Sequence, residues 1–161
     1  MIKSAGLIMY MFEEGKLKVF LVHPGGPFWK NKDKDAWSIP KGEVDNGENG
    51  VKLLLTAKRE FEEETGMKPP KDEESYIYVG SVKQPPRKRV YAYAFEDDGS
   101  FWQGNLNCES FIELEWPPKS GKKEKFPEVD DAGFFDLEKS RYKLHKYQQP
   151  LVDELREALG V

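Results

Sequence analysis

The sequence predicts a mixed domain of the α/β or α+β class, because strand-like and helix-like segments both occur along the chain. Short stretches of alternating apolar and polar residues are separated by turns rich in glycine and proline, a pattern typical of β-strands. Two longer segments carry apolar residues every three or four positions, as amphipathic helices do. The 161 residues are enough for one core, so we expect a single domain over residues 1–161.

Strand-like segments dominate the first and middle parts of the chain. The first two are joined by a turn at residues 13–16. Residues 23–35 are expected to form a loop because their proline and glycine residues cannot continue a strand. Residues 117–125, rich in lysine, are expected to form another loop. The expected strands lie at residues 6–12, 17–22, 37–39, 76–82, 90–95, 101–102 and 111–116.

The helix-like segments lie in the middle and at the end of the sequence. The central one ends before Pro69 and Pro70, and a further helix begins within residues 136–141. The last one starts at Pro150, because proline is favoured in a first helical turn. Its apolar stripe consists of Leu151, Leu155 and Leu159, and that of the central helix consists of Leu53, Leu54, Ala57 and Phe61.

The end of the central helix carries an unusual concentration of negative charge. Glu60, Glu63 and Glu64 stand at positions i, i+3 and i+4, so their carboxylates share one strip of helix surface. Such like charges repel each other, whereas a divalent cation would reverse the penalty because Mg²⁺ and Mn²⁺ prefer carboxylate oxygens. The alternative is a solvated acidic face, which suits Glu62 but explains Glu64 poorly.

These residues resemble the Nudix box, the pattern G-x5-E-x7-R-E-U-x-E-E-x-G-U of the Nudix hydrolases, where U is a bulky aliphatic residue. Ten residues separate Glu48 from Arg59, three more than in the family pattern. We expect Asn49 and Gly50 to lie in a loop, with the helix starting near Val51, because glycine is a poor helix former. The fixed positions are filled by Gly42, Glu48, Arg59, Glu60, Glu63, Glu64 and Gly66, and the hydrophobic ones by Phe61 and Met67.

The resemblance extends on both sides of the box. The segment from Trp37 to Gly42 looks like the W-x-x-P-K-G segment of members that cleave dinucleoside polyphosphates. Phe126-Pro127-Glu128 followed by Phe134-Phe135 resembles the region where such enzymes place another catalytic or metal-binding glutamate. The implied fold is a Nudix-type α/β/α sandwich, a mixed curved sheet with the central helix on one face and the C-terminal helix on the other.

The resemblance also implies an activity, the hydrolysis of a phosphoanhydride in a nucleoside diphosphate-linked substrate with Mg²⁺ or Mn²⁺. It assigns Glu60, Glu63 and Glu64 to metal, together with a backbone carbonyl of Lys41 or Gly42. Arg59 would orient the carboxylates, and Glu128, or alternatively Glu60, would act as general base. A dinucleoside polyphosphate such as diadenosine tetraphosphate is the favoured substrate. The alternatives are a nucleoside triphosphate, an inositol pyrophosphate, an RNA 5′ end, or nucleotide sensing without hydrolysis.

A basic cluster at residues 87–89 is the best candidate for contacts with substrate phosphates, because Arg and Lys pair with phosphate oxygens. Side chains alternate along an extended segment, so we expect Arg87 and Arg89 to face the site and Lys88 to face away. An exposed, charged hairpin end is the alternative. The substrate-binding residues expected from this cluster and the neighbouring motifs are Arg87, Arg89, Tyr91, Lys41 and Trp37.

Composition excludes several classes of function. A net charge of −4 argues against a general nucleic-acid-binding protein, which would carry a basic field. No apolar run is long enough to span a bilayer, and no signal peptide is evident. The single cysteine, Cys108, excludes an intramolecular disulfide and favours a reducing compartment. We therefore expect a cytoplasmic monomer or homodimer that binds a small nucleotide.

Overall fold

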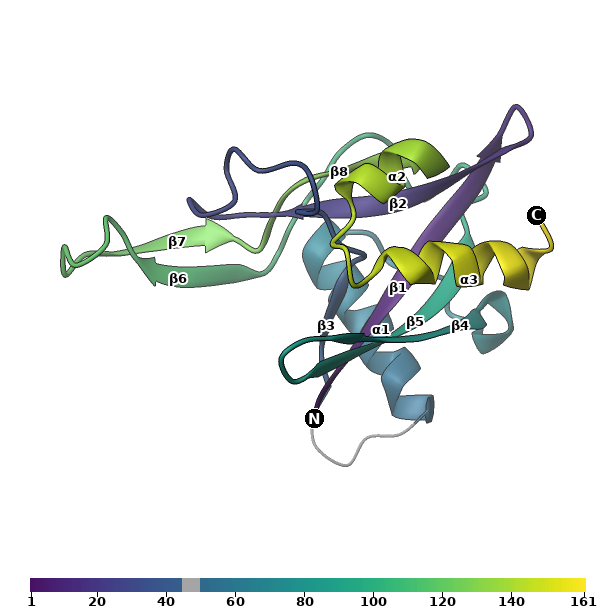
Figure 1. Cartoon of the computed structure of the whole chain (residues 1–161), viewed down its shortest axis with the longest axis horizontal. Coiled ribbons are helices and arrows are strands. Elements are labelled where there is room, and N and C mark those ends of the chain that lie inside the picture. Colours follow the sequence, from purple (N-terminus) through teal and green to yellow (C-terminus); the bar gives the residue numbers. More distant parts are fainter. Residues whose placement is uncertain (45–49) are drawn as a thin grey trace.

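The structure, a computed structural model, describes residues 1–44 and 50–161 (Figure 1). The strands are β1 (Ile2–Glu13), β2 (Lys16–Pro24), β3 (Lys41–Glu43), β4 (Ile77–Gln84), β5 (Lys88–Glu96), β6 (Phe111–Glu115), β7 (Lys123–Pro127) and β8 (Val129–Asp136). The helices are α1 (Gly50–Thr65), a short 3-10 turn (Glu73–Ser75), α2 (Leu137–Lys143) and α3 (Gln149–Leu159).

The main sheet is mixed and curved, and the long strand β1 lies at its centre. The strand order is β4-β5-β1-β2-β8, and β3 pairs with the beginning of β1. β1 runs parallel to β5 but antiparallel to β2 and β3. The parallel pair joins residues far apart in sequence, Ile2 with Lys88, at one end of the sheet.

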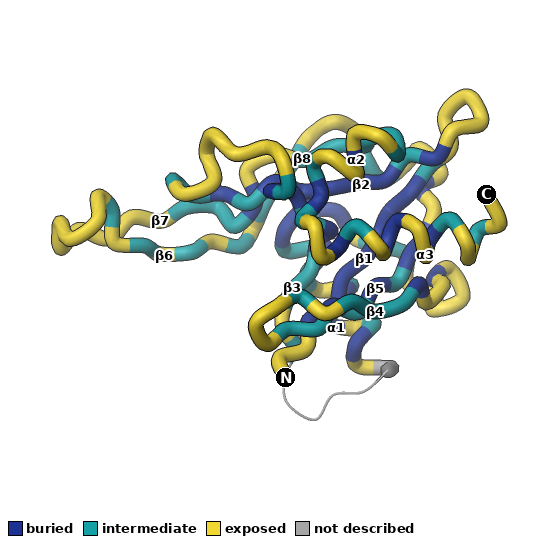
Figure 2. Tube along the Cα trace, in the orientation of Figure 1, coloured by how far each residue is buried: buried dark blue, intermediate teal, exposed yellow. Residues whose placement is uncertain are grey.

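The two faces of the sheet carry separate apolar cores, because successive side chains of β1 point to opposite faces. Leu7 and Met9 pack towards α1 with Phe61, whereas Ile8 packs towards α3 with Leu155. Figure 2 shows β1 and β2 buried between these layers. The predicted sandwich is confirmed. No helix of the described residues is long and apolar enough to cross a membrane.

A two-stranded arm formed by β6 and β7 projects from the sandwich (Figure 1). The loop after β2 lies beside it. Gly26 of this loop approaches Ile112 and Leu114 of the arm, and the Phe28 ring meets the Trp116 ring at 5.6 Å. A two-stranded hairpin is marginal by itself in water, so these contacts stabilise the arm.

Two predicted strands are wrong. Trp37 and Ser38 form only isolated bridges to Leu144 and Val22, and the regular strand β3 begins later, at Lys41. Residues 101–102 turn back instead of extending. The backbone N–H groups of Phe101 and Trp102 donate to the carboxylate of Asp97, and the Trp102 ring packs 4.9 Å from that of Phe20.

Two predicted boundaries also need correction. α1 begins at Gly50, so the placement of Gly50 in a loop is wrong by one residue, although helix ends commonly vary by that much. Asn49 and Glu48 lie outside the described residues. β7 begins at Lys123, inside the expected loop 117–125, because residues 123–127 pair with β6.

We predict that Phe61→Ala destabilises the protein by about 3–5 kcal/mol, the usual cost of emptying a buried aromatic site. Phe61 is fully buried, and its ring contacts those of Phe20 and Phe95. The exposed Leu55 on the same helix provides the control, since Leu55→Ala should change stability by no more than about 0.5 kcal/mol. Urea denaturation measures both, and equal losses would contradict the assignment of the α1 core face.

Candidate active site

A polar cleft of about 360 Å³ opens at the end of the sheet where β3 pairs with the beginning of β1. Its walls come from β1, β3, α1, β5 and the junction between β7 and β8. A smaller hollow of about 120 Å³ shares Lys41, Glu64 and Glu128 with it and reaches the end of β2. The cleft is lined by Ser4, Lys41, Gly42, Glu43, Glu60, Glu64, Lys88 and Glu128.

Glu64 is the most deeply buried acid of the cleft, with 8% of its surface exposed. It lies one turn beyond Glu60, on the side of α1 that faces the sheet. The backbone N–H of Lys41 donates to Glu64 Oε1 at 3.2 Å, which ties α1 to β3. Burial raises the pKa of Glu64 to about 8, and the nearby Glu128 and Glu60 carboxylates add to the shift, whereas Lys41 opposes it.

Glu60 fits against β3 because Gly42 has no side chain. A Cβ atom at position 42 would lie 2.0 Å from the Glu60 carboxyl carbon, closer than real atoms approach. Arg59 Nη2 donates to Glu60 Oε1 at 3.3 Å, and Arg59 Nε lies 3.7 Å from Glu63 Oε1. Burial, followed by the charge of Glu63, raises the pKa of Glu60.

Glu128 reaches the cleft from the opposite side, at the single residue between β7 and β8. Burial raises the pKa of its carboxyl, and the charge of Glu63 adds to the shift while Lys41 opposes it. Glu63 itself is not among the lining residues, and its side chain remains 43% exposed beside Arg59. The tertiary structure therefore brings Glu60, Glu64 and Glu128 around one cavity, with Glu63 at its edge.

Among the described lining residues, the positive charge of the cleft comes from Lys41 and Lys88 and not from arginines. Burial lowers the pKa of Lys41, and the charge of Lys88 lowers it further. The expectation that Lys88 faces away from the site is wrong, because Lys88 lines the cleft. Arg87 is exposed in the turn before β5, and Arg89 Nη1 donates to Ser81 Oγ at 2.9 Å. Parallel pairing of Lys88 with Ile2 places the beginning of β5 at this edge of the sheet.

Two predicted substrate contacts lie outside the lining of the carboxylate cleft. Tyr91 packs on the α1 side of the sheet, where Lys3 Nζ lies 5.9 Å from its ring centroid. Trp37 is buried in the wall of a separate pocket, and its indole N–H donates to Asp33 Oδ1 at 2.7 Å. The predicted box residue Glu48 falls in the segment that the structure does not describe.

Ser4 is a cleft residue that sequence reasoning missed. Its side chain is fully buried, and within residues 1–44 and 50–161 its Oγ has no hydrogen-bond partner. A buried hydroxyl without a partner is costly to the folded state. The residue carries no local signal, because only the pairing of Ser4 with Glu43 brings it there.

The donor set fits a divalent cation in kind, because carboxylate and carbonyl oxygens are the ligands of Mg²⁺ and Mn²⁺. Glu60 packs closely against Gly42, which brings its carboxylate beside the β3 backbone. In the described part of the chain, no three side chains of His, Cys, Asp or Glu are arranged so that together they could hold a metal ion. Arg59 forms ion pairs with Glu60 and Glu63, two of the three glutamates expected to bind metal.

Comparison with known proteins supports the same fold and family. The family model of the NUDIX domain matches residues 2–155, and no curated protein sequence is significantly similar to the chain. A binary complex of the Ap4A hydrolase of C. elegans is 18% identical, with a TM-score of 0.59 over 99% of this chain and 98% of that chain.

Two further solved structures are similar over most of their lengths. The NUDIX domain of Shewanella oneidensis NrtR, complexed with ADP ribose, is 18% identical, with a TM-score of 0.60 over 98% of this chain and 88% of that chain. The MutT protein of Methanosarcina mazei Go1 is 22% identical, with a TM-score of 0.54 over 98% and 94%. Identities this low establish the shared fold alone.

We predict that the metal-free protein loses stability as the pH rises from about 5 to 8. The folded state retains a proton on Glu64, whose pKa is about 8, whereas an unfolded glutamate releases it near pH 4.3. The unfolded state therefore binds fewer protons in this window, and the free energy of unfolding falls with pH. Glu64→Gln should remove the part of this loss that belongs to Glu64 and stabilise the protein by roughly 2–5 kcal/mol at pH 8. A smaller loss should remain, because the pKa values of Glu60 and Glu128 are also raised.

Urea denaturation in the presence of a chelator measures this effect at pH 5 and pH 8. Glu62→Gln on the same helix provides the control, because Glu62 lines a different surface hollow, with Lys58 and Arg59. The control variant should keep the wild-type slope. A Glu64→Gln variant that is equally or more pH-sensitive would contradict the assigned burial of the carboxyl.

Proposed function

Because the chain belongs to the NUDIX domain family, we propose that this pyrophosphohydrolase uses a divalent cation to cleave a dinucleoside polyphosphate such as diadenosine tetraphosphate. One observation carries the proposal. The carboxylates of Glu60, Glu64 and Glu128 surround one cleft that also contains Lys41 and Lys88. Such a cleft offers oxygen ligands for cations and positive charge for phosphate in the same space.

The carboxylates would hold the cation. Glu60 and Glu64 would bind it with a carbonyl of Lys41 or Gly42, and Glu63 would join them after turning away from Arg59. Mg²⁺ or Mn²⁺ would lower the pKa of bound water and neutralise phosphate charge. Burial is the main cause of the raised pKa values of Glu60 and Glu64, and repulsion between neighbouring carboxylates adds to both. A bound cation would offset that repulsion.

The remaining residues activate the attacking water, orient the carboxylates and pair with the phosphate oxygens. We assign to Glu128 the removal of a proton from the attacking water, whose oxygen forms a bond to phosphorus as the anhydride P–O bond breaks. The departing phosphate carries the electron pair of that bond. Arg59 orients Glu60 and Glu63, and Lys41 and Lys88 pair with phosphate oxygens.

One observation favours the dinucleoside polyphosphate. The segment from Trp37 to Gly42 is similar to that of family members that act on such substrates. Within this proposal, Arg87, Arg89, Tyr91 and Trp37 serve parts of the substrate outside the cleft. The single cysteine, without a disulfide, supports a cytoplasmic location.

A turnover assay with Mg²⁺ or Mn²⁺ tests the proposal on diadenosine tetraphosphate, a nucleoside triphosphate, an inositol pyrophosphate and a triphosphorylated RNA. We expect diadenosine tetraphosphate to give the highest kcat/KM, and another preferred substrate would overturn the choice. Tight binding of nucleotides without turnover would instead indicate a sensor.

Glu63→Gln and Glu64→Gln should each lower turnover at least about a hundredfold, because each removes a charged ligand from the proposed cation site. Glu62→Gln is the matched control and should retain activity within about threefold. Circular dichroism verifies that all three variants fold. Near-normal turnover of both site variants would exclude the proposed cation site.

Lys88→Ala should raise the KM for diadenosine tetraphosphate about tenfold or more. The KM for a substrate that contains only two phosphates should rise less. The four phosphates of diadenosine tetraphosphate need more cationic partners than two phosphates do. A hydrogen bond to a charged group contributes about 1.5–3 kcal/mol. Arg87→Ala, in the exposed neighbouring turn, should have a smaller effect. The control is Lys16→Ala, because Lys16 is exposed at the opposite end of β1, where it pairs with Glu13. A larger effect from Arg87→Ala would show that the turn, and not the cleft, binds phosphate.

A further inference from the structure

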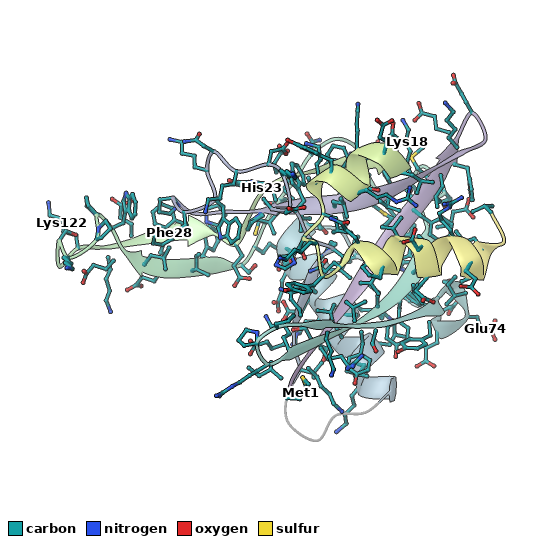
Figure 3. All side chains as sticks on the ribbon, viewed as in Figure 1. Met1, Lys18, His23, Phe28, Glu74 and Lys122 are labelled. Atoms are coloured by element: carbon teal, nitrogen blue, oxygen red, sulfur yellow. The ribbon has the colours of Figure 1, made fainter. Side chains whose placement is uncertain are left out.

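We infer that Gly25 is a positioning residue for Glu128, and that Gly25 and Ser110 together form a backbone clamp around it. The inference rests on the proposed function, in which Glu128 is the general base. Sequence reasoning placed Gly25 in a loop without assigning it a role. Gly25 directly follows Pro24, the last residue of β2. Figure 3 labels His23 and Phe28, which stand before and after it in the sequence, and shows Phe28 beside the arm.

The clamp holds Glu128 through both of its backbone polar groups. The N–H of Gly25 donates to the carbonyl oxygen of Glu128 at 2.9 Å. The N–H of Glu128 in turn donates to the carbonyl oxygen of Ser110 at 3.0 Å. These partners come from separate segments, the loop after β2 and the residue before β6. Glu128, the residue between β7 and β8, is therefore fixed from two sides.

The pairing of β2 with β8 is irregular beside this clamp. His23 pairs with Asp131 and Pro24 with Val129, so the register shifts and Asp130 is the extra residue. Irregularities of this kind redirect side chains and are common next to active sites. Here the shift follows immediately after Glu128, whose side chain lines the carboxylate cleft.

Gly25 is required by space and not by backbone conformation. A Cβ atom at this position would lie 2.0 Å from the carbonyl oxygen of Pro127 and 3.0 Å from its carbonyl carbon. Both atoms belong to the peptide group that joins Pro127 to Glu128. Any side chain at position 25 therefore pushes directly on the backbone of Glu128, and a displacement of about 1 Å in a catalytic group costs up to about a hundredfold in rate.

The test compares Gly25→Ala with Gly133→Ala. Gly133 lies on β8, and its added Cβ would meet only the Phe135 ring, at 3.7 Å, which is ordinary contact. We expect Gly25→Ala to lower kcat at least about tenfold with KM changed less than about threefold, because the displaced group acts in the chemical step. Gly133→Ala should keep wild-type kcat.

A double-mutant cycle separates positioning from general damage to the fold. In a Glu128→Gln background the general base is already lost, so Gly25→Ala should lower kcat by less than about twofold further. Wild-type kcat in Gly25→Ala, or an equal fall in both backgrounds, would overturn the inference. If Gly25→Ala fails to fold, Ser110→Gly loosens the other side of the clamp and takes its place in the same cycle.

The failure of the proposed function is distinguishable from the failure of this inference. Absence of hydrolysis by the wild-type protein on every substrate would refute the function alone. The amide NMR resonances of Glu128 and Val129 then report the clamp. They should shift in Gly25→Ala and remain in place in Gly133→Ala, and unchanged resonances in both variants would overturn the clamp.

Discussion

The burial of acidic side chains from α1 against the backbone of β3 is the constraint on which the site depends. Phe61 and Ala57 anchor α1 in the apolar core. Helical spacing then carries Glu60 and Glu64 to the edge of the sheet. The helix cannot bury its apolar face without also partly desolvating these carboxylates. The raised pKa of Glu64 is the electrostatic consequence of this placement.

Two backbone features of β3 make that burial tolerable. The N–H of Lys41 donates to the Glu64 carboxylate, and the absent side chain of Gly42 leaves room for Glu60. The charge of Lys41 opposes the pKa shifts of Glu64 and Glu128. A divalent cation would relieve the remaining repulsion, so the proposed metal binding and the predicted loss of stability without metal would depend on the same contacts.

The cleft collects residues from distant parts of the chain because the sheet is mixed. β1 pairs with β3 on one side and with β5 on the other, which brings Ser4, Lys41 and Lys88 to one edge. Glu128 arrives separately, between the two-stranded arm and β8. The carboxylates of α1 are placed by a rigid helix, whereas Glu128 depends on a loop and on the base of the arm.

The sequence pattern by itself predicts the apolar face of α1 and the shared strip of Glu60, Glu63 and Glu64, because helical spacing places residues three and four apart on one surface. The sandwich is predicted by the resemblance to the Nudix box, since the pattern alone indicates only a mixed α/β or α+β domain. Local patterns fail where long-range pairing decides the outcome. Strand alternation predicts that Lys88 faces away, yet Lys88 lines the cleft. No local pattern indicates a role for Ser4 or Gly25. Their positions follow from strand register and from backbone groups that meet only in the folded chain. Alternation along a strand specifies which residues share a face, but tertiary packing decides what that face contacts.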